Sequence, residues 1–161
     1  MRVGIGYDIH RFLDPPQGTL RLGGIDVDGA PCLDGHSDGD ALIHAIIDAL
    51  LGAAGEGDIG QHFPPGDETT RDVDSRELLK RIHKLVAAAG FTVENVDATV
   101  IAERPRLGPH IGSMRESIAA VLGLPHTRVN VKATTNEGLD AVGAGHAVAA
   151  MAVALLEEDV P

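Results

Sequence analysis

A helix-length apolar segment with a polar residue at every fourth position constrains the fold of this chain more than any other feature. Residues 41–51 read ALIHAIIDALL, and Asp40, His44 and Asp48 interrupt the apolar pattern at intervals of four. Residues four apart lie on the same face of an α-helix, so this helix is apolar around most of its surface and carries one polar stripe. A buried ionisable group is costly unless it is paired or bound. The stripe therefore predicts a partner for these side chains inside the fold.

The remaining periodic segments predict a sheet with helices packed against it. Expected strands are residues 2–12, 19–29, 95–103 and 128–135, and expected helices are the apolar segment above, capped by Ser37 or Asp38, and residues 74–90 and 111–123. The first two strands are separated by a turn and are expected to form a hairpin. Residues 146–158 fit a helix by their Ala and Leu content, but they also fit a fully buried strand because they are apolar on all sides.

The length and punctuation of the chain predict one domain. A chain of 161 residues is long enough for one hydrophobic core and too short for two ordinary ones. Residues 57–72 are rich in Gly, Pro and Asp and are expected to form a long loop of the kind that often carries function. We therefore expect a single α+β domain over residues 1–161, with a mixed sheet of about four or five strands and helices on one face.

Charge and composition exclude several classes of function. The net charge is −11 and aromatic residues make up 2% of the chain, which argues against nucleic-acid binding through basic patches or stacking. The apolar run at 147–156 is too short to cross a bilayer, so no membrane association is expected. Cys32 is the single cysteine, which excludes a disulfide framework and fits a cytoplasmic location.

The polar stripe and the first strand together suggest a metal site. Asp8 and His10 are two residues apart on a predicted strand, so their side chains leave the same face. With His44 they would form a set of two histidines and one carboxylate, which is typical of catalytic Zn²⁺ sites with an open position. Asp40 and Asp48 would then orient the ligands. The alternative is that His44 is a hydrogen-bonded structural histidine.

Two further polar groups suggest phosphate and hydroxyl binding. His36 and Ser37 precede a helix, where free N–H groups favour a phosphate, although Ser37 also suits a simple N-cap. Asp58 lies between glycines and would either bind substrate hydroxyls or form an Asx-turn. Segment 134–137, TTNE, offers two hydroxyls for phosphate oxygens and a carboxylate for a divalent cation, or it is an ordinary polar strand end.

Five motifs in this order resemble one enzyme family nearly end to end. They are GYDIHRF, HSDGDALIHAIIDALLGAAGEGDIGQHFP, DSRELL, RPRLGPHI and NVKATTNE. The chain thereby resembles the 2-C-methyl-D-erythritol 2,4-cyclodiphosphate synthases. The resemblance implies a homotrimer with active sites between subunits, a strand for the final segment, and a role in the non-mevalonate route to isoprenoid precursors. The implied reaction converts 4-diphosphocytidyl-2-C-methyl-D-erythritol 2-phosphate to the 2,4-cyclodiphosphate and releases CMP.

The resemblance also assigns residues to roles. It implies Zn²⁺ on Asp8, His10 and His44, a second ion, Mg²⁺ or Mn²⁺, on Glu137, and transition-state stabilisation by His36 and Thr135. Implied substrate-binding residues are Asp8, Ile9, His10, His36, Ser37, Asp58, Ile59, Gly60, Phe63, Asp67, Ala102, Arg106, Leu107, Gly108, Thr134, Thr135, Asn136 and Glu137. Residues 63–67 match a flexible flap and residues 102–108 a cytidine pocket. Pro65 stands where the family usually has an acidic residue.

The expected mechanism is an intramolecular phosphoryl transfer. The 2-phosphate oxygen attacks the β-phosphorus of the diphosphate, so positioning and charge stabilisation carry the catalysis. Two other classes fit the polar residues alone. A metal-dependent phosphohydrolase would release inorganic phosphate, and a non-catalytic zinc-binding protein would bind the metal without turnover.

Overall fold

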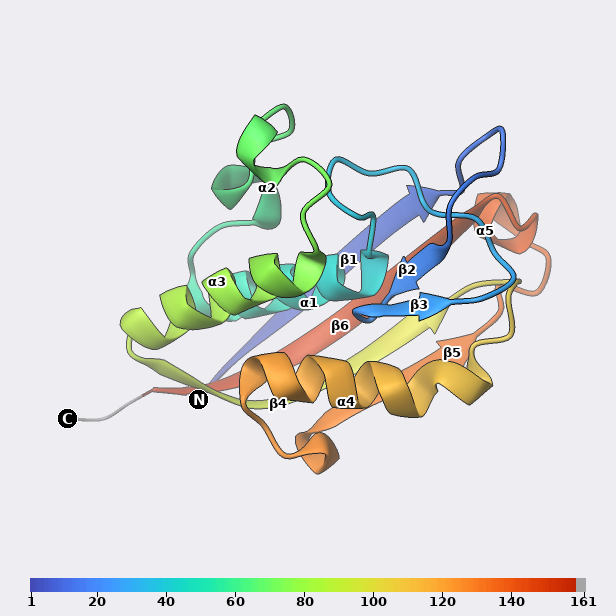
Figure 1. The fold of residues 1–161 in the computed structure, drawn as a ribbon. Coiled ribbons are helices and arrows are strands. Elements are labelled where there is room, and N and C mark those ends of the chain that lie inside the picture. Colours follow the sequence, from blue (N-terminus) through green and yellow to red (C-terminus); the bar gives the residue numbers. More distant parts are fainter. Residues whose placement is uncertain (159–161) are drawn as a thin grey trace.

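A four-stranded mixed sheet organises the fold in the computed structural model, which describes residues 1–158 (Figure 1). The strand order is β1 (Arg2–Arg11), β6 (Ala147–Glu158), β4 (Phe91–Ile101) and β5 (Val129–Thr134). β6 is antiparallel to both β1 and β4, whereas β4 and β5 are parallel. Consequently β1, β4 and β5 all end at the same end of the sheet, with β1 and β5 at its opposite edges. The predicted α+β class with about four strands is confirmed, and residues 159–161 of the predicted domain lie outside the described residues.

Three long helices cover one face of this sheet (Figure 1). They are α1 (Ala41–Ala54), α3 (Ser75–Ala88) and α4 (Ile111–Leu122), close to the predicted positions. Short helices lie outside the predicted helices: α2 (Ile59–His62), α5 (Asp140–Gly143) and the 3₁₀ turns Glu68–Thr70, Gly108–His110 and His126–Arg128. None of the described helices has the length and apolarity that crossing a bilayer requires.

Helix α1 is the centre of the core. Almost every side chain along it is buried, including the small residues Ala45 and Ala49. Gly4 and Gly6 of β1 face this helix, and a Cβ atom at either position would overlap with its backbone. The glycines at alternate positions of β1 thus have a packing role, because they let α1 lie directly against the sheet.

Two local predictions are wrong. Residues 19–29 do not pair with the first strand but form their own two-stranded sheet, β2 (Leu20–Leu22) and β3 (Ile25–Val27). β1 instead pairs along its whole length with β6, which is buried along most of its length and competes better for the central sheet. Helix α1 is capped by Asp40 rather than by Ser37 or Asp38.

The second face of the sheet is apolar and open in the single chain. Its exposed large side chains are Val3, Ile5, Tyr7, Ile9, Met151 and Val153. They come from the two adjacent strands β1 and β6, so they form one patch. A contiguous apolar patch of this kind marks a surface that contacts another molecule.

Candidate functional site

The three predicted zinc ligands meet at the C-terminal end of β1. His10 Nε2 lies 2.8 Å from Asp8 Oδ2, and His44 Nδ1 lies 3.1 Å from the same oxygen. The two histidine nitrogens are 3.3 Å apart. Among residues 1–158 this is the one group of three or more His, Cys, Asp or Glu side chains whose ligand atoms converge closely enough to share an ion.

These distances fit a metal ion. Ligands about 2.0–2.1 Å from a tetrahedral Zn²⁺ lie about 3.3 Å from one another, close to the separations in the triad. The side chains of Asp8, His10 and His44 are 24%, 19% and 10% exposed, so the site opens to the surface and leaves room for a further ligand. The triad therefore has the geometry that a cation site requires.

The outward-facing nitrogens of both histidines are held by neighbouring groups. His10 Nδ1 lies 2.6 Å from the carbonyl oxygen of Asp34, to which it donates. His44 Nε2 lies 3.0 Å from the hydroxyls of both Ser37 and Ser75. Hydrogen bonds of this kind orient a metal-binding imidazole.

Without a metal, the triad shares protons. Burial disfavours the charged carboxylate of Asp8, but hydrogen bonds from His10 and His44 outweigh it and lower the pKa of Asp8 to about 2. Burial also disfavours protonated His10, yet its hydrogen bond to Asp8 outweighs this and raises the pKa of His10. A metal ion would therefore displace a proton from the site as it binds.

Asp40 and Asp48 do not orient the ligands, contrary to the sequence hypothesis. The fully buried carboxylate of Asp40 accepts hydrogen bonds from the backbone N–H groups of Gly23, Gly24 and Ile43, so it joins the β2–β3 turn to α1. Asp48 accepts a hydrogen bond from the backbone N–H of Ile59 and so fixes the start of α2. The predicted polar stripe exists, but His44 is the only one of its three residues that belongs to the triad.

The phosphate-binding candidates His36 and Ser37 lie beside the triad and are tied to the predicted flap. His36 Nε2 lies 2.8 Å from the carbonyl oxygen of Asp67, and the Asp72 N–H donates to the carbonyl oxygen of His36. The Asp67 side chain caps the following 3₁₀ turn. The flap therefore approaches the HSDGD segment in this chain, and His36 is its main polar contact.

Within the single chain, Asp58 forms a local turn, which is the simpler of its two predicted roles. Its exposed carboxylate caps α2 by accepting hydrogen bonds from the backbone and side-chain N–H groups of Gln61. These hydrogen bonds lower the pKa of Asp58. Ile59 and Gly60 belong to the same short helix, and Phe63 is its C-cap.

The predicted substrate-binding residue Ile9 points to the opposite face of the sheet from Asp8, and it is 43% exposed there.

The predicted cytidine-binding residues line a cavity at the other edge of the sheet. This cavity has a volume of about 610 Å³ and lies between the loop after β4 and the end of β5. Its lining includes Ala102, Arg106, Leu107, Gly108, Thr134 and Thr135. All six are predicted substrate-binding residues, so the structure brings together groups that are about thirty residues apart in the sequence.

The loop after β5 is built around exposed polar residues. Thr135 Oγ1 donates to Glu137 Oε1 at 3.1 Å, and Glu137 has a φ of +52°. Asn136 donates through its side-chain amide to the carboxylate of Asp140. Glu103 holds the loop from below, because its carboxylate accepts from the backbone N–H groups of Asn136 and Gly138 at 3.0 and 3.1 Å.

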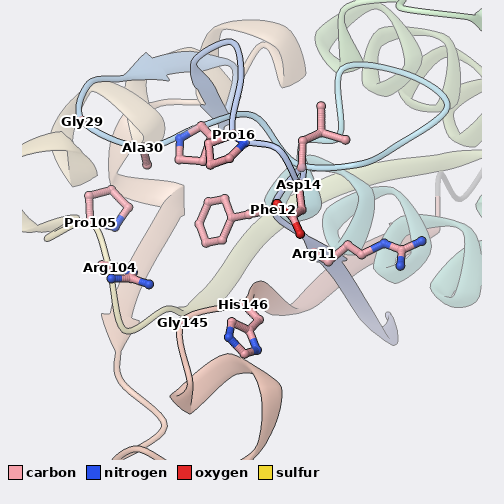
Figure 2. Close-up of a pocket in the computed structure, with 12 residues that line it drawn as sticks. Arg11, Phe12, Asp14, Pro16, Gly29, Ala30, Arg104, Pro105, Gly145 and His146 are labelled. Carbon is pink, nitrogen blue, oxygen red and sulfur yellow. The ribbon is translucent and has the colours of Figure 1, made fainter.

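A second, larger cavity adjoins this one, and its lining includes Arg104 and Pro105 of the predicted pocket segment 102–108 but none of the individually predicted substrate-binding residues. It has a volume of about 740 Å³. Figure 2 shows the ring of Phe12 pointing toward Pro16 and Pro105, with Arg104 and His146 on the side of the β6 start. Pro105 lines both cavities, so the loop after β4 separates them.

The triad and the cavity lined by the predicted cytidine-binding residues do not meet within one chain. The strand register places Asp8 beside Ala150, Ala150 beside Val100, and Val100 beside Ala133. Asp8 and the end of β5 are thus level with each other but three strand spacings apart, which is about 14 Å. Glu137, the predicted second metal ligand, lies on the nucleotide side and outside the triad.

Sequence reasoning missed three supporting residues: Ser75, Asp38 as a side-chain acceptor, and Glu103. Ser75 is fully buried at the start of α3, and its hydroxyl contacts both His44 and Asp38. Ser75 belongs to the motif DSRELL, but nothing in the local pattern connects it to His44.

Comparison with known proteins agrees with this geometry. The family model described as the YgbB family matches residues 1–157. The 2-C-methyl-D-erythritol 2,4-cyclodiphosphate synthase of Gloeobacter violaceus is 56% identical over 158 residues, which cover 98% of this chain and 96% of that protein. The solved structure of IspF from Plasmodium falciparum, a CDP complex, is 32% identical with a TM-score of 0.85, and the match covers 99% of this chain and 97% of that one.

A longer protein contains the same fold. The bifunctional IspDF from Campylobacter jejuni has a TM-score of 0.93 at 38% identity. The match covers 98% of this chain and 42% of that chain, so this chain spans less than half of the bifunctional protein.

Proposed function

This chain belongs to the YgbB family, which matches it over residues 1–157, and we propose that it is a cyclodiphosphate synthase, a lyase of the non-mevalonate isoprenoid route. It would convert 4-diphosphocytidyl-2-C-methyl-D-erythritol 2-phosphate to 2-C-methyl-D-erythritol 2,4-cyclodiphosphate. The observation that carries the proposal is end-to-end similarity to synthases, 56% in one relative, together with an intact triad.

In the reaction, an oxygen of the 2-phosphate forms a bond to the β-phosphorus, and the bond from that phosphorus to the CMP oxygen breaks. The cavity beside Arg106 and Thr134 would hold the cytidine and its phosphate. His36 and Thr135 would donate hydrogen bonds to phosphate oxygens as charge shifts between them. Holding both reacting ends in one conformer supplies much of the barrier lowering.

Two cations are proposed for this site. Asp8, His10 and His44 would hold Zn²⁺, and Glu137 would hold Mg²⁺ or Mn²⁺. When bound, these ions offset the negative charge of the phosphates, which matters in a chain of net charge −11. The donor set of the triad, with two imidazoles and one carboxylate, suits Zn²⁺ better than the oxygen-preferring Mg²⁺.

We propose a homotrimer with the active site between subunits. The triad at the β1 edge and the cavity at the β5 edge are level but about 14 Å apart, so a neighbouring copy must bring its β5 edge to the first copy's β1 edge. Such a head-to-tail contact closes into a ring when the rotation permits. The apolar patch on β1 and β6 supports this assembly, because copies packed together would remove it from water. We also propose a cytoplasmic location, because the family's substrate is a small molecule.

Phosphorus NMR tests the proposed reaction. The purified chain, loaded with Zn²⁺, is incubated with the cytidyl substrate and Mg²⁺, and a His44→Ala sample serves as the control. Formation of CMP and the cyclodiphosphate in equal amounts is the expected result. Release of inorganic phosphate would identify a phosphohydrolase instead, and zinc binding without any turnover would identify a non-catalytic metal protein.

A further inference from the structure

A glutamate side chain takes over from the β4–β5 ladder where the loop after β5 begins. At the end of the ladder, the Ala102 N–H donates to the carbonyl oxygen of Thr134 at 3.0 Å. One residue further along, the half-buried Glu103 supplies its carboxylate instead of its backbone. Glu103 Oε1 accepts from the backbone N–H groups of Asn136 at 3.0 Å and Gly138 at 3.1 Å. A single oxygen atom therefore ties the loop to the end of β4.

The turn that this oxygen holds has an unfavourable backbone conformation. The two N–H groups flank Glu137, whose φ is +52°, and Gly138 follows at +76°. The Leu139 N–H donates to the carbonyl oxygen of Asn136 at 2.9 Å and closes the turn. Positive φ at both central residues is the pattern of a type I′ turn, which favours Gly, Asn and Asp. A glutamate at the first central position costs free energy, so neighbouring contacts must hold it there.

Glu103 also borders the cavity that is proposed to hold the cytidine. It lines this cavity together with Arg106 and Thr134. Within the turn, Thr135 Oγ1 donates to Glu137 Oε1 at 3.1 Å, so the backbone conformation at Glu137 also sets the place of the Thr135 hydroxyl. One side chain thus fixes the turn relative to the cavity beside it.

We propose that Glu103 is a positioning residue of the nucleotide half of the site. By accepting from both N–H groups that flank Glu137, it keeps the turn in its left-handed conformation and holds Thr135 and Glu137 beside the nucleotide's phosphates. The inference deepens the proposed function and rests on it, because the ligand is the nucleotide of the proposed substrate. Glu103 itself does not contact the reacting atoms.

The role requires an acceptor oxygen and not a negative charge. One oxygen atom makes both hydrogen bonds, and an amide carbonyl oxygen also has two lone pairs. Glu103→Gln should therefore preserve the contact, whereas Glu103→Leu, of similar size, leaves two N–H groups without this acceptor. Glu116→Leu is the matched control, because Glu116 is exposed on α4 and has no hydrogen bond or ion pair among residues 1–158.

Calorimetry with CDP measures the effect on binding. The zinc-loaded proteins are titrated with CDP, once without added Mg²⁺ and once with it. We expect Glu103→Leu to weaken CDP binding about tenfold in both conditions, the order of effect of losing hydrogen bonds that hold a binding group. Glu103→Gln and Glu116→Leu should bind CDP like the wild type, and zinc content should be equal in all four proteins. Wild-type affinity in Glu103→Leu, or an equal loss in Glu103→Gln, would overturn the inference.

Amide hydrogen exchange separates positioning from a general loss of structure. The N–H groups of Asn136 and Gly138 should exchange about tenfold faster in Glu103→Leu than in the wild type or in Glu103→Gln. The N–H of Val100, in the middle of the sheet, should exchange equally slowly in all of them. Unchanged exchange at Asn136 and Gly138 in Glu103→Leu would also overturn the inference. Failure of the wild type to bind CDP would instead overturn the proposed nucleotide site, while the exchange rates would still show whether Glu103 holds the turn.

Discussion

The triad at the β1 edge and the loop at the β5 edge are built in opposite ways. In the triad, the inward-facing atoms of Asp8, His10 and His44 lie within 3.3 Å of one another, and the outward nitrogens of both histidines are already hydrogen-bonded. At the other edge, Thr135 and Glu137 are exposed and contact mainly each other. One half of the proposed site is therefore complete within a single chain, and the other half presents its groups outward.

This contrast follows from what each half is proposed to bind. A small cation needs ligands within about 2 Å of one point, so its site must be preformed by packed elements such as β1 and α1. A nucleotide and its phosphates are large and must enter and leave, so an open cavity with exposed donors suits them better. The predictions below test this division, from the largest expected effect to the smallest.

Removing one ligand should have the largest effect. We expect His44→Ala to abolish zinc binding by the triad and to lower turnover more than about 100-fold, beyond the usual effect of losing an orienting partner. The fold should persist, because the change removes a polar side chain from the edge of the core. Metal analysis, circular dichroism and CMP release measure these outcomes. A zinc content equal to that of the wild type would contradict the assignment.

Mixing two inactive variants tests whether the halves come from different chains. His44→Ala damages the β1 edge and Thr135→Ala the β5 edge, so neither should be active alone. In trimers assembled at random from equal amounts, about one site in four joins two intact edges. We expect recovery of about a quarter of wild-type activity after co-expression. If the mixture stays as inactive as its components, the site does not form between subunits.

Glu137→Gln should affect only the β5 half. Zinc binding should be unchanged because Glu137 lies outside the triad. The Mg²⁺ concentration for half-maximal activity should rise about tenfold, since one charged ligand is lost. A steady-state Mg²⁺ titration gives the answer, with zinc content as the internal control. An unchanged titration would leave Glu137 as a turn residue with positive φ.

The pH dependence of folding stability provides a smaller test at Asp74, which caps α3 beside the triad. A hydrogen bond from Arg76, joined by Arg21, outweighs partial burial and lowers the pKa of Asp74 to about 2. Because this value lies below the ordinary 3.8, the Asp74 carboxylate stabilises the fold above about pH 4 and loses that contribution as the pH falls toward 2.

Thermal unfolding between pH 2 and pH 5 measures this contribution. Asp74→Asn should unfold at a lower temperature than the wild type at pH 5, and the difference should shrink toward pH 2. The exposed Asp28→Asn serves as the control and should follow the wild type. A constant difference across the range would show that Asp74 acts as a helix cap and not through its charge.

The comparison also shows where sequence reasoning succeeded. Helix α1, its polar stripe and the convergence of Asp8 and His10 follow from periodicity, because residues two apart on a strand or four apart on a helix share a face. The order of the motifs predicted the family, and the comparisons confirm it. The hairpin prediction failed because pairing of β1 with β6 joins opposite ends of the chain, and no local pattern records it.

The sequence by itself determined most of the local elements, the convergence of Asp8, His10 and His44, and the family, since each depends on short-range spacing or motif order. Only the tertiary structure decided that Asp40 and Asp48 support neighbouring turns. It alone placed Ser75 against His44, and it separated the triad from the proposed nucleotide cavity by the width of the sheet. The physical reason is that these contacts join residues far apart in the chain, where strand order and packing, rather than periodicity, select the neighbours.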